Sequence, residues 1–212
     1  MVEIINQIFI LTPAIAGVDF CVIAADTRVS QGYSVLDGQY KRTYKLTDKC
    51  VLTSSGMVSD MEELAKIMQV KVKVYERNHG RQPDTESLAE ALSHQFYSRR
   101  FMPYYSFSLL CGLTKDGKGV QYGYDAIGSY DKIIIGVQGT GKELGCPVLD
   151  NQFKGHNNLS PKLAQDRQSA IDAAKDAIHS IAERDIYTGD NVEITIIDST
   201  GVHSKMEKVR KD

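Results

Sequence analysis

The chain has 212 residues, of which 42% are hydrophobic and 25% are charged, and this is enough for one large domain whose core needs no disulfide or metal. Lysine and arginine total 25 against 27 aspartates and glutamates, so bulk charge gives no reason to expect binding to nucleic acid or to an anionic membrane. No segment holds the roughly 18 consecutive apolar residues of a membrane-spanning helix.

The cysteines are widely separated and show neither CxxC spacing nor a nearby histidine. They are Cys21, Cys50, Cys111 and Cys146. This pattern predicts reduced thiols in a reducing compartment rather than a disulfide framework or a zinc site. We therefore expect no metal and no cofactor.

The stretch from residue 14 to residue 28, AIAGVDFCVIAADTR, predicts a tight hairpin. Its second half is apolar on both faces, which indicates a buried strand. The strand ends in Asp26-Thr27-Arg28. Because charges at the end of a buried strand must be paired or take part in chemistry, Asp26 is predicted either to form an ion pair, with Arg28 or Arg42, or to serve a reaction.

The next segments predict strands and then helices. Residues 33–46 predict a second hairpin or bulged strand, and Cys50-Val51-Leu52 predicts a short buried strand that runs into TSSG. Ser59 and Glu62 have the spacing of a capping box, which predicts a helix that ends at Asn78-His79-Gly80. A second helix is expected to begin at Asp84 or Thr85.

The second half predicts a hairpin with a DG turn over residues 107–113 and 119–124, followed by a buried strand at 133–135. A long helix is expected from Ser160-Pro161 to Glu183-Arg184, and a final hairpin over residues 192–197 and 202–209. This order predicts an α+β fold, most simply a sandwich of two sheets with helix pairs outside it.

Residues 136–143, GVQGTGKE, have the glycine and lysine spacing of a phosphate-binding loop. Such a loop needs a serine or threonine hydroxyl at its last position for magnesium, and Glu143 would place a carboxylate against the phosphates. A nucleotide-binding domain is therefore the weaker alternative for the whole chain.

Residues 184–190, RDIYTGD, follow the long helix. Asp185 and Thr188 are three residues apart, so their side chains can point the same way and hydrogen-bond a third group. An ordinary helix C-terminus that ends at Gly189 would explain the same letters.

Taken in order, these motifs together with RRFMPYY, GLTKDGKGVQYGYDAIGSYDK and PVLDNQF resemble the β-type subunits of the 20S proteasome over nearly the whole chain. The resemblance implies the four-layer αββα fold of N-terminal-nucleophile hydrolases, with two antiparallel sheets flanked by helices. It implies a short extension over residues 1–9 and a single domain over 10–212. It also implies partners, the other α and β subunits of a 28-subunit core of two α and two β heptameric rings, and a place in ubiquitin-dependent degradation in the cytoplasm and nucleus.

Members of this family that cut peptides use a threonine freed as the first residue, whose α-amine serves as the base. The resemblance assigns the supporting positions to Asp26, Gly56, Thr140 within Gly139-Thr140-Gly141, Asp185 and Thr188.

The two central positions of that frame differ from the catalytic pattern. Counting back from Asp26 without gaps, the nucleophile position falls on Ile10, and the lysine position falls on Arg42. An isoleucine has no attacking atom, and an arginine stays protonated in proteins. The sequence thus predicts a non-catalytic subunit, and the alternative is a threonine endopeptidase with Thr12 exposed by processing.

Two segments are candidates for contacts with other subunits. Arg100, Phe101, Tyr104 and Tyr105 combine arginine with aromatic rings after a helix, which is typical of interface cores. The alternative is that Phe101 and Tyr104 pack into their own domain. The resemblance implies that the loop with Asp125 meets an adjacent subunit near its substrate channel.

Overall fold

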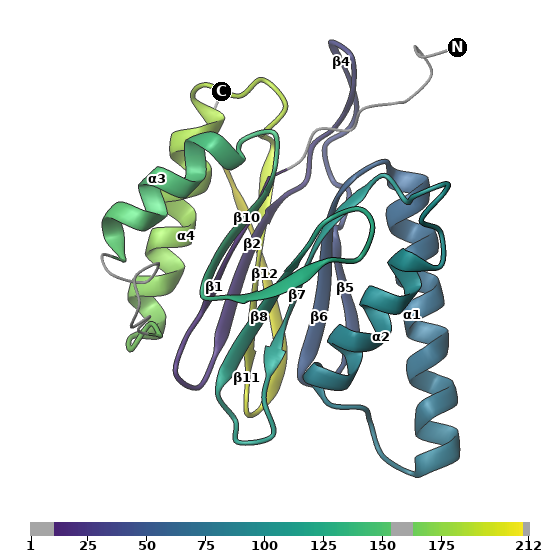
Figure 1. The fold of residues 1–212 in the computed structure, drawn as a ribbon. Coiled ribbons are helices and arrows are strands. Elements are labelled where there is room, and N and C mark those ends of the chain that lie inside the picture. Colours follow the sequence, from purple (N-terminus) through teal and green to yellow (C-terminus); the bar gives the residue numbers. More distant parts are fainter. Residues whose placement is uncertain (1–10, 154–162, 210–212) are drawn as a thin grey trace.

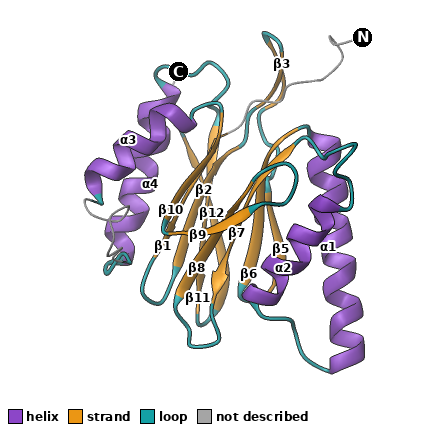
Figure 2. Cartoon of the chain, in the orientation of Figure 1, coloured by secondary structure: helices purple, strands orange, loops and turns teal. Residues whose placement is uncertain are grey.

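The computed structural model describes residues 11–153 and 163–209, and these residues form two five-stranded sheets, a small hairpin and four helices (Figures 1 and 2). The first sheet has the order β10-β1-β2-β11-β12. Its strands are β1 (Leu11–Ala16), β2 (Cys21–Asp26), β10 (Ile135–Gly139), β11 (Asn191–Asp198) and β12 (Gly201–Lys208). All of its strand pairs are antiparallel.

The second sheet has the order β5-β6-β7-β8-β9 and is also antiparallel throughout. Its strands are β5 (Thr43–Thr47), β6 (Cys50–Gly56), β7 (Ser106–Leu113), β8 (Gly119–Tyr124) and β9 (Tyr130–Ile133). The separate hairpin consists of β3 (Val29–Gln31) and β4 (Ser34–Asp37). The helices are α1 (Val58–His79), α2 (Thr85–Tyr97), α3 (Lys142–Gln152) and α4 (Arg167–Ala182).

The sheets lie face to face, with α3 and α4 covering the first and α1 and α2 covering the second (Figure 1). Strand β2 shows how the sequence produces these layers. Val22 and Ala24 face the α4 side, whereas Cys21 and Ile23 pack against the second sheet. Because successive side chains of a strand point to opposite faces, a strand that is apolar throughout must be covered on both. The predicted four-layer αββα fold is confirmed.

The predicted hairpins at β1–β2, β7–β8 and β11–β12 are confirmed, and the predicted hairpin after residue 33 begins earlier, at β3. Helix α2 begins as predicted, because the Asp84 side chain accepts a hydrogen bond from the backbone N–H of Ser87.

The capping box predicted for α1 is wrong. The N-cap is Met57, which has no side-chain capping bond, and Ser59 lies inside the first turn. The helix follows directly from β6, and Asp60 in its first turn instead accepts a hydrogen bond from the backbone N–H of Tyr105 at 2.8 Å. The helix ends as predicted, at Gly80 in the left-handed conformation.

The buried strand predicted at residues 133–135 is also wrong. Ile133 ends β9 in the second sheet, and Ile135 begins β10 in the first, so the chain crosses between the sheets at Ile134. This apolar run is partly buried because it joins the two sheets rather than lying within one.

Two helices differ from the sequence prediction. Helix α3 was not expected, because Pro147 and Gly145 lie inside it. Helix α4 begins at Arg167, where the Asp166 side chain accepts from the backbone N–H of Ser169, and not at Ser160-Pro161, which lies outside the described residues. Within residues 11–153 and 163–209, no helix is both long and apolar enough to cross a membrane.

Candidate functional site

A buried ion pair lies where β2 ends. Both side chains, Asp26 and Arg42, are fully buried, and Arg42 Nη1 lies 3.6 Å from Asp26 Oδ1. Arg42 Nη2 donates a hydrogen bond to the backbone carbonyl of Arg28. Burial lowers the pKa of Arg42, and the Asp26 charge acts in the opposite direction. Of the two partners considered for Asp26, Arg42 forms this pair.

A network of tyrosine hydroxyls lies near Arg42. The Arg42 guanidinium lies 6.0 Å from the centre of the Tyr40 ring. The Tyr40 hydroxyl lies 2.8 Å from the Tyr44 hydroxyl and donates to Glu62 Oε1 at 3.2 Å. Burial and these neighbours raise the pKa of Tyr40, so its phenol stays neutral and keeps its proton. The Asp26 carboxylate is thus the charge that opposes the effect of burial on Arg42, while the neighbouring Lys41 is exposed.

The second predicted group forms around the Asp185 carboxylate. Oδ2 of Asp185 accepts hydrogen bonds from Thr140 Oγ1 at 2.7 Å and from Thr188 Oγ1 at 2.8 Å. Oδ1 accepts from the backbone N–H of Tyr187 at 3.0 Å. Thr140 comes from the turn after β10, so this carboxylate joins that turn to the segment after α4. The side chains of Asp185 and Thr188 do point toward each other, but Thr188 bonds to Asp185 itself, so of the two only Asp185 binds the third group, Thr140.

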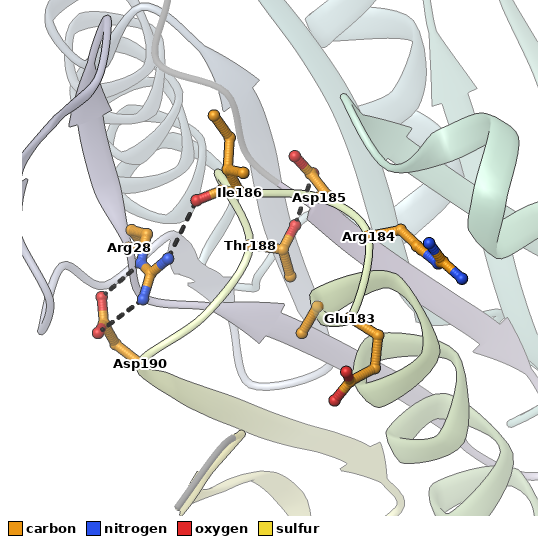
Figure 3. Close-up of a pocket in the computed structure, with 8 residues that line it drawn as sticks. Arg28, Glu183, Arg184, Asp185, Ile186, Thr188 and Asp190 are labelled. Atoms are coloured by element: carbon orange, nitrogen blue, oxygen red, sulfur yellow. Dashed lines mark hydrogen bonds and ion pairs between the residues drawn. The ribbon is translucent and has the colours of Figure 1, made fainter. Parts of the chain in front are cut away.

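A cavity of about 390 Å³ lies beside this group and is lined by residues of the segment after α4 and by Arg28 (Figure 3). Arg28 forms a bidentate pair with Asp190, with Nε 2.9 Å from Oδ2 and Nη2 3.1 Å from Oδ1. Arg28 Nη1 also donates to the Ile186 carbonyl at 3.0 Å. Sequence reasoning missed this pair, since the two residues are 162 positions apart.

Gly189 lies directly beside the Arg28 guanidinium. A Cβ atom on Gly189 would lie 2.6 Å from the Arg28 guanidinium carbon, so a larger residue there would displace the guanidinium from its present position. Helix α4 ends at Ala182, so the alternative of a helix C-terminus at Gly189 is wrong, and Gly189 instead leaves room for the Arg28 guanidinium.

Gly56 ends β6 with a φ of 130°, in a region that L side chains rarely adopt. A Cβ atom there would lie 2.2 Å from the carbonyl oxygen of Tyr105 on the adjacent strand segment. That same oxygen accepts a hydrogen bond from the backbone N–H of Met57 at 2.8 Å. The glycine expected in the oxyanion region is thus also required by close backbone packing.

The two candidate nucleophile positions are Ile10 and Thr12, and the structure describes only Thr12. Ile10 lies outside the described residues. Thr12 is buried near the start of β1, opposite Gln138 of β10, and its hydroxyl lies 3.5 Å from that of Thr53. Within the described ranges, no group of three or more His, Cys, Asp and Glu side chains could hold a metal ion. Glu143 lies in the first turn of α3, where the phosphate-loop alternative would need a hydroxyl.

Comparison with known proteins places the chain in a family. Residues 12–197 match the Proteasome family of proteasome subunits. Proteasome subunit beta type-1 of Arabidopsis thaliana is 44% identical over 207 residues, which cover 94% of this chain and 92% of that protein. The chain belongs to the proteasome β-type subunit family.

Other relatives agree with this membership. Proteasome subunit beta type-1 of Drosophila melanogaster is 42% identical over 203 residues, covering 94% of this chain and 86% of the relative. The probable proteasome subunit beta type-6 of Schizosaccharomyces pombe is 32% identical over 210 residues, covering 95% and 93%. The two relatives at 44% and 42% identity are both named beta type-1, the type called β6 in ring nomenclature, a name unrelated to strand β6.

The interface candidates of this β-type subunit divide into two groups. Phe101 is 95% exposed with the Arg100 guanidinium 5.4 Å from its ring centre, and Tyr105 is also exposed. Tyr104 is buried in its own domain, edge-on to Phe96 and accepting a hydrogen bond from Gln95. The prediction that Tyr104 is an interface residue is therefore wrong. The alternative, packing into its own domain, is confirmed for Tyr104 and is wrong for Phe101.

Asp125, in the loop between β8 and β9, is exposed. Its Oδ1 accepts hydrogen bonds from the backbone N–H groups of Ile127 at 3.0 Å and Ser129 at 2.8 Å. The carboxylate therefore shapes its own loop, and it carries a negative charge at the surface.

Proposed function

We propose that this chain is a non-catalytic β subunit, of the beta type-1 kind, in the 20S proteasome core particle. Its role is to hold a place in a seven-membered β ring and to help line the substrate pocket of a neighbour, within ATP- and ubiquitin-dependent protein degradation. Its partners are the other α and β subunits of a core of two α and two β heptameric rings, in the cytoplasm and nucleus.

The observation that carries the proposal is Arg42 at the position that the resemblance assigns to a lysine. A lysine amine changes its protonation state readily when buried, whereas a guanidinium does not lose its proton in proteins. Here the guanidinium is fully buried against Asp26, so the pair acts as a fixed structural contact. This supports a subunit in which Asp26 and Arg42 stabilise the fold, and in which the lysine position provides no base that can change its protonation state.

The alternative, a threonine endopeptidase that uses Thr12, is not favoured by its surroundings. To act, Thr12 would need a free α-amine next to its hydroxyl, and residues 1–11 would have to be removed. Thr12 is buried and precedes Pro13, and both lie in the part of β1 that pairs with β10.

A first prediction concerns covalent labelling. Particles that contain this chain are expected to react with threonine-directed electrophiles only on other subunits, because Ile10, at the nucleophile position that the resemblance assigns, has no attacking atom. The measurement is mass spectrometry of the intact subunits and their tryptic peptides after labelling. An adduct on Thr12, together with loss of the first eleven residues, would establish the alternative.

A second prediction concerns the neighbour's pocket. Asp125→Asn keeps the oxygen that accepts from Ile127 and Ser129 and removes the charge. We expect one peptidase activity of the particle to lose preference for basic substrate groups by about two- to fivefold, which corresponds to roughly 0.5–1 kcal/mol for a solvent-accessible charge pair. The measurement is kcat/KM for each peptidase activity with basic and neutral substrates.

The control is Asp116→Asn, which removes an exposed carboxylate from the turn at the opposite end of β8. It is expected to change none of these preferences. Equal behaviour of the two variants would refute the pocket-lining role, and normal particle assembly without this chain would refute the architectural role as well.

A further inference from the structure

The segment between α2 and β7 displays two large apolar side chains at the surface. Phe101 is 95% exposed and Met102 is 80% exposed. Single exposed apolar side chains are common on proteins, whereas adjacent ones with this exposure are typical of a surface that a partner covers. Together with the two preceding residues, Arg99 and Arg100, which are also exposed, they form what we call the Phe101 patch.

The backbone of the Phe101 patch is held at both ends by hydrogen bonds. The backbone N–H of Arg100 donates to the Tyr97 carbonyl at 3.0 Å, so a turn continues directly from α2. At the other end, the backbone N–H of Tyr105 donates to Asp60 on α1. A surface whose backbone is already ordered loses little chain freedom on binding, which favours association.

Two guanidinium groups of the patch lie on aromatic rings. The Arg99 guanidinium carbon lies 4.6 Å from the centre of the buried Tyr104 ring, and that of Arg100 lies 5.4 Å from the centre of the Phe101 ring. Within residues 11–153 and 163–209, neither arginine forms an ion pair. Because a stacked guanidinium uses its flat face, the N–H groups at its edge remain able to bind carboxylates.

Two other kinds of occupant fit the patch less well. In a symmetric contact with a second copy of this chain, identical patches would meet and their arginines would repel one another. Nucleic acid also binds arginine and exposed aromatic rings, but the chain has a formal net charge of -2 and thus lacks the basic character of nucleic-acid-binding domains. Charge complementarity therefore favours an acidic segment of another protein.

We propose that the Phe101 patch binds a segment of an adjacent subunit in which aspartate or glutamate side chains flank an apolar residue. The carboxylates accept hydrogen bonds from the edges of Arg99 and Arg100, and the apolar residue packs on Phe101 and Met102. Arginine, methionine and aromatic residues are the types enriched in the cores of interfaces. The inference rests on the proposed function, because it needs a neighbouring subunit, and it adds the chemistry of one contact with that neighbour.

Competition for incorporation tests the patch. Cells co-express the wild-type chain and a variant with different tags, and the ratio of tags is measured in the purified particle. Arg100→Gln is expected to be incorporated about threefold less than wild type, and Phe101→Ser about fivefold less. Because both side chains are exposed, each purified variant is expected to keep the denaturant midpoint of wild type, which separates a lost contact from a lost fold.

Arg77→Gln is the matched control for charge. Arg77 is also exposed, and it lies in the last turn of α1, about 26 Å along the helix axis from Asp60 in the first turn. The substitution removes the same positive charge at a distance from the patch. It is expected to be incorporated as well as wild type.

Photo-crosslinking followed by charge exchange tests the identity of the occupant. Phe101 is replaced by p-benzoylphenylalanine, and the crosslinked peptides of the irradiated particle are sequenced. The expected product joins position 101 to a peptide of another subunit with an aspartate or glutamate beside the crosslinked residue. Arg100→Glu alone is expected to be incorporated about tenfold less than wild type, and replacing that acidic residue of the neighbour by arginine is expected to restore most of the loss.

The outcomes separate the two proposals. If wild-type chain enters the particle, but Arg100→Gln competes as well as Arg77→Gln does, the patch proposal is overturned and the proposed function stands. A crosslink to a second copy of this chain, to nucleic acid or to a segment without an acidic residue also overturns the patch proposal. If tagged wild-type chain is absent from the particle, the proposed function itself fails.

Discussion

Asp26→Asn is expected to lower the free energy of unfolding by roughly 3–5 kcal/mol, the usual cost of breaking one side of a buried ion pair. The amide keeps the shape of the carboxylate but leaves the buried Arg42 guanidinium without the Asp26 charge. The measurement is the denaturant midpoint of the purified chain, together with the amount of chain found in assembled particles.

Two further variants test whether the unpaired buried charge causes the loss of stability in Asp26→Asn. Asp190→Asn makes the same change in the Arg28 pair, which is partly exposed, so the expected cost is only about 1 kcal/mol. The double replacement of Asp26 by Leu and Arg42 by Met removes both charges, and we expect it to regain most of the lost stability, as apolar replacements of buried ion pairs do. A midpoint for Asp26→Asn that equals wild type would show that the pair does not stabilise the fold.

The Asp26–Arg42 pair shows which features of the site the sequence alone can predict. The continuous apolar run of β2 predicted a strand buried on both faces and a carboxylate at its end, because both features depend on neighbouring residues only. The choice between Arg28 and Arg42 as partner stayed open. The choice depends on where the fold places Arg42, which comes just before β5 in the other sheet. No local sequence pattern around β2 predicts that placement.

The wrong predictions have the same origin. The apolar residues 133–135 fit a single strand by composition, yet the chain changes sheets at Ile134. Helix α3 was missed because its own residues, Gly145 and Pro147, oppose helix formation, and packing against α4 and the first sheet outweighs that preference.

Among the site residues, contacts between near neighbours in the sequence could be predicted and distant contacts could not. Asp185 and Thr188 are three residues apart, so their contact could be predicted locally, whereas Thr140 is 45 positions away and was placed near them only by the family resemblance. Phe101 and Tyr104 belong to one motif of similar composition. One is exposed and one is buried, because only Tyr104 reaches the ring of Phe96.

Gly56→Ala is expected to be among the most destabilising single substitutions in the chain, at about 3 kcal/mol or more. A φ of 130° in a residue other than glycine costs about 1–3 kcal/mol by itself. The new methyl group would also lie 2.2 Å from the Tyr105 carbonyl oxygen, so backbone must move and weaken the hydrogen bond from Met57. Denaturant unfolding and yield of incorporated chain measure the effect.

Gly80→Ala provides the matched control. Gly80 also has a positive φ, 67°, but a Cβ atom there meets nothing within 4 Å, so only the backbone preference of about 1–2 kcal/mol is lost. A Gly56 effect well above the Gly80 effect would mean that packing alone requires this glycine, and its presence would then be no argument for catalysis in this chain. Equal effects would mean that the strand accommodates the methyl group, and the requirement at Gly56 would have to come from another source than the fold.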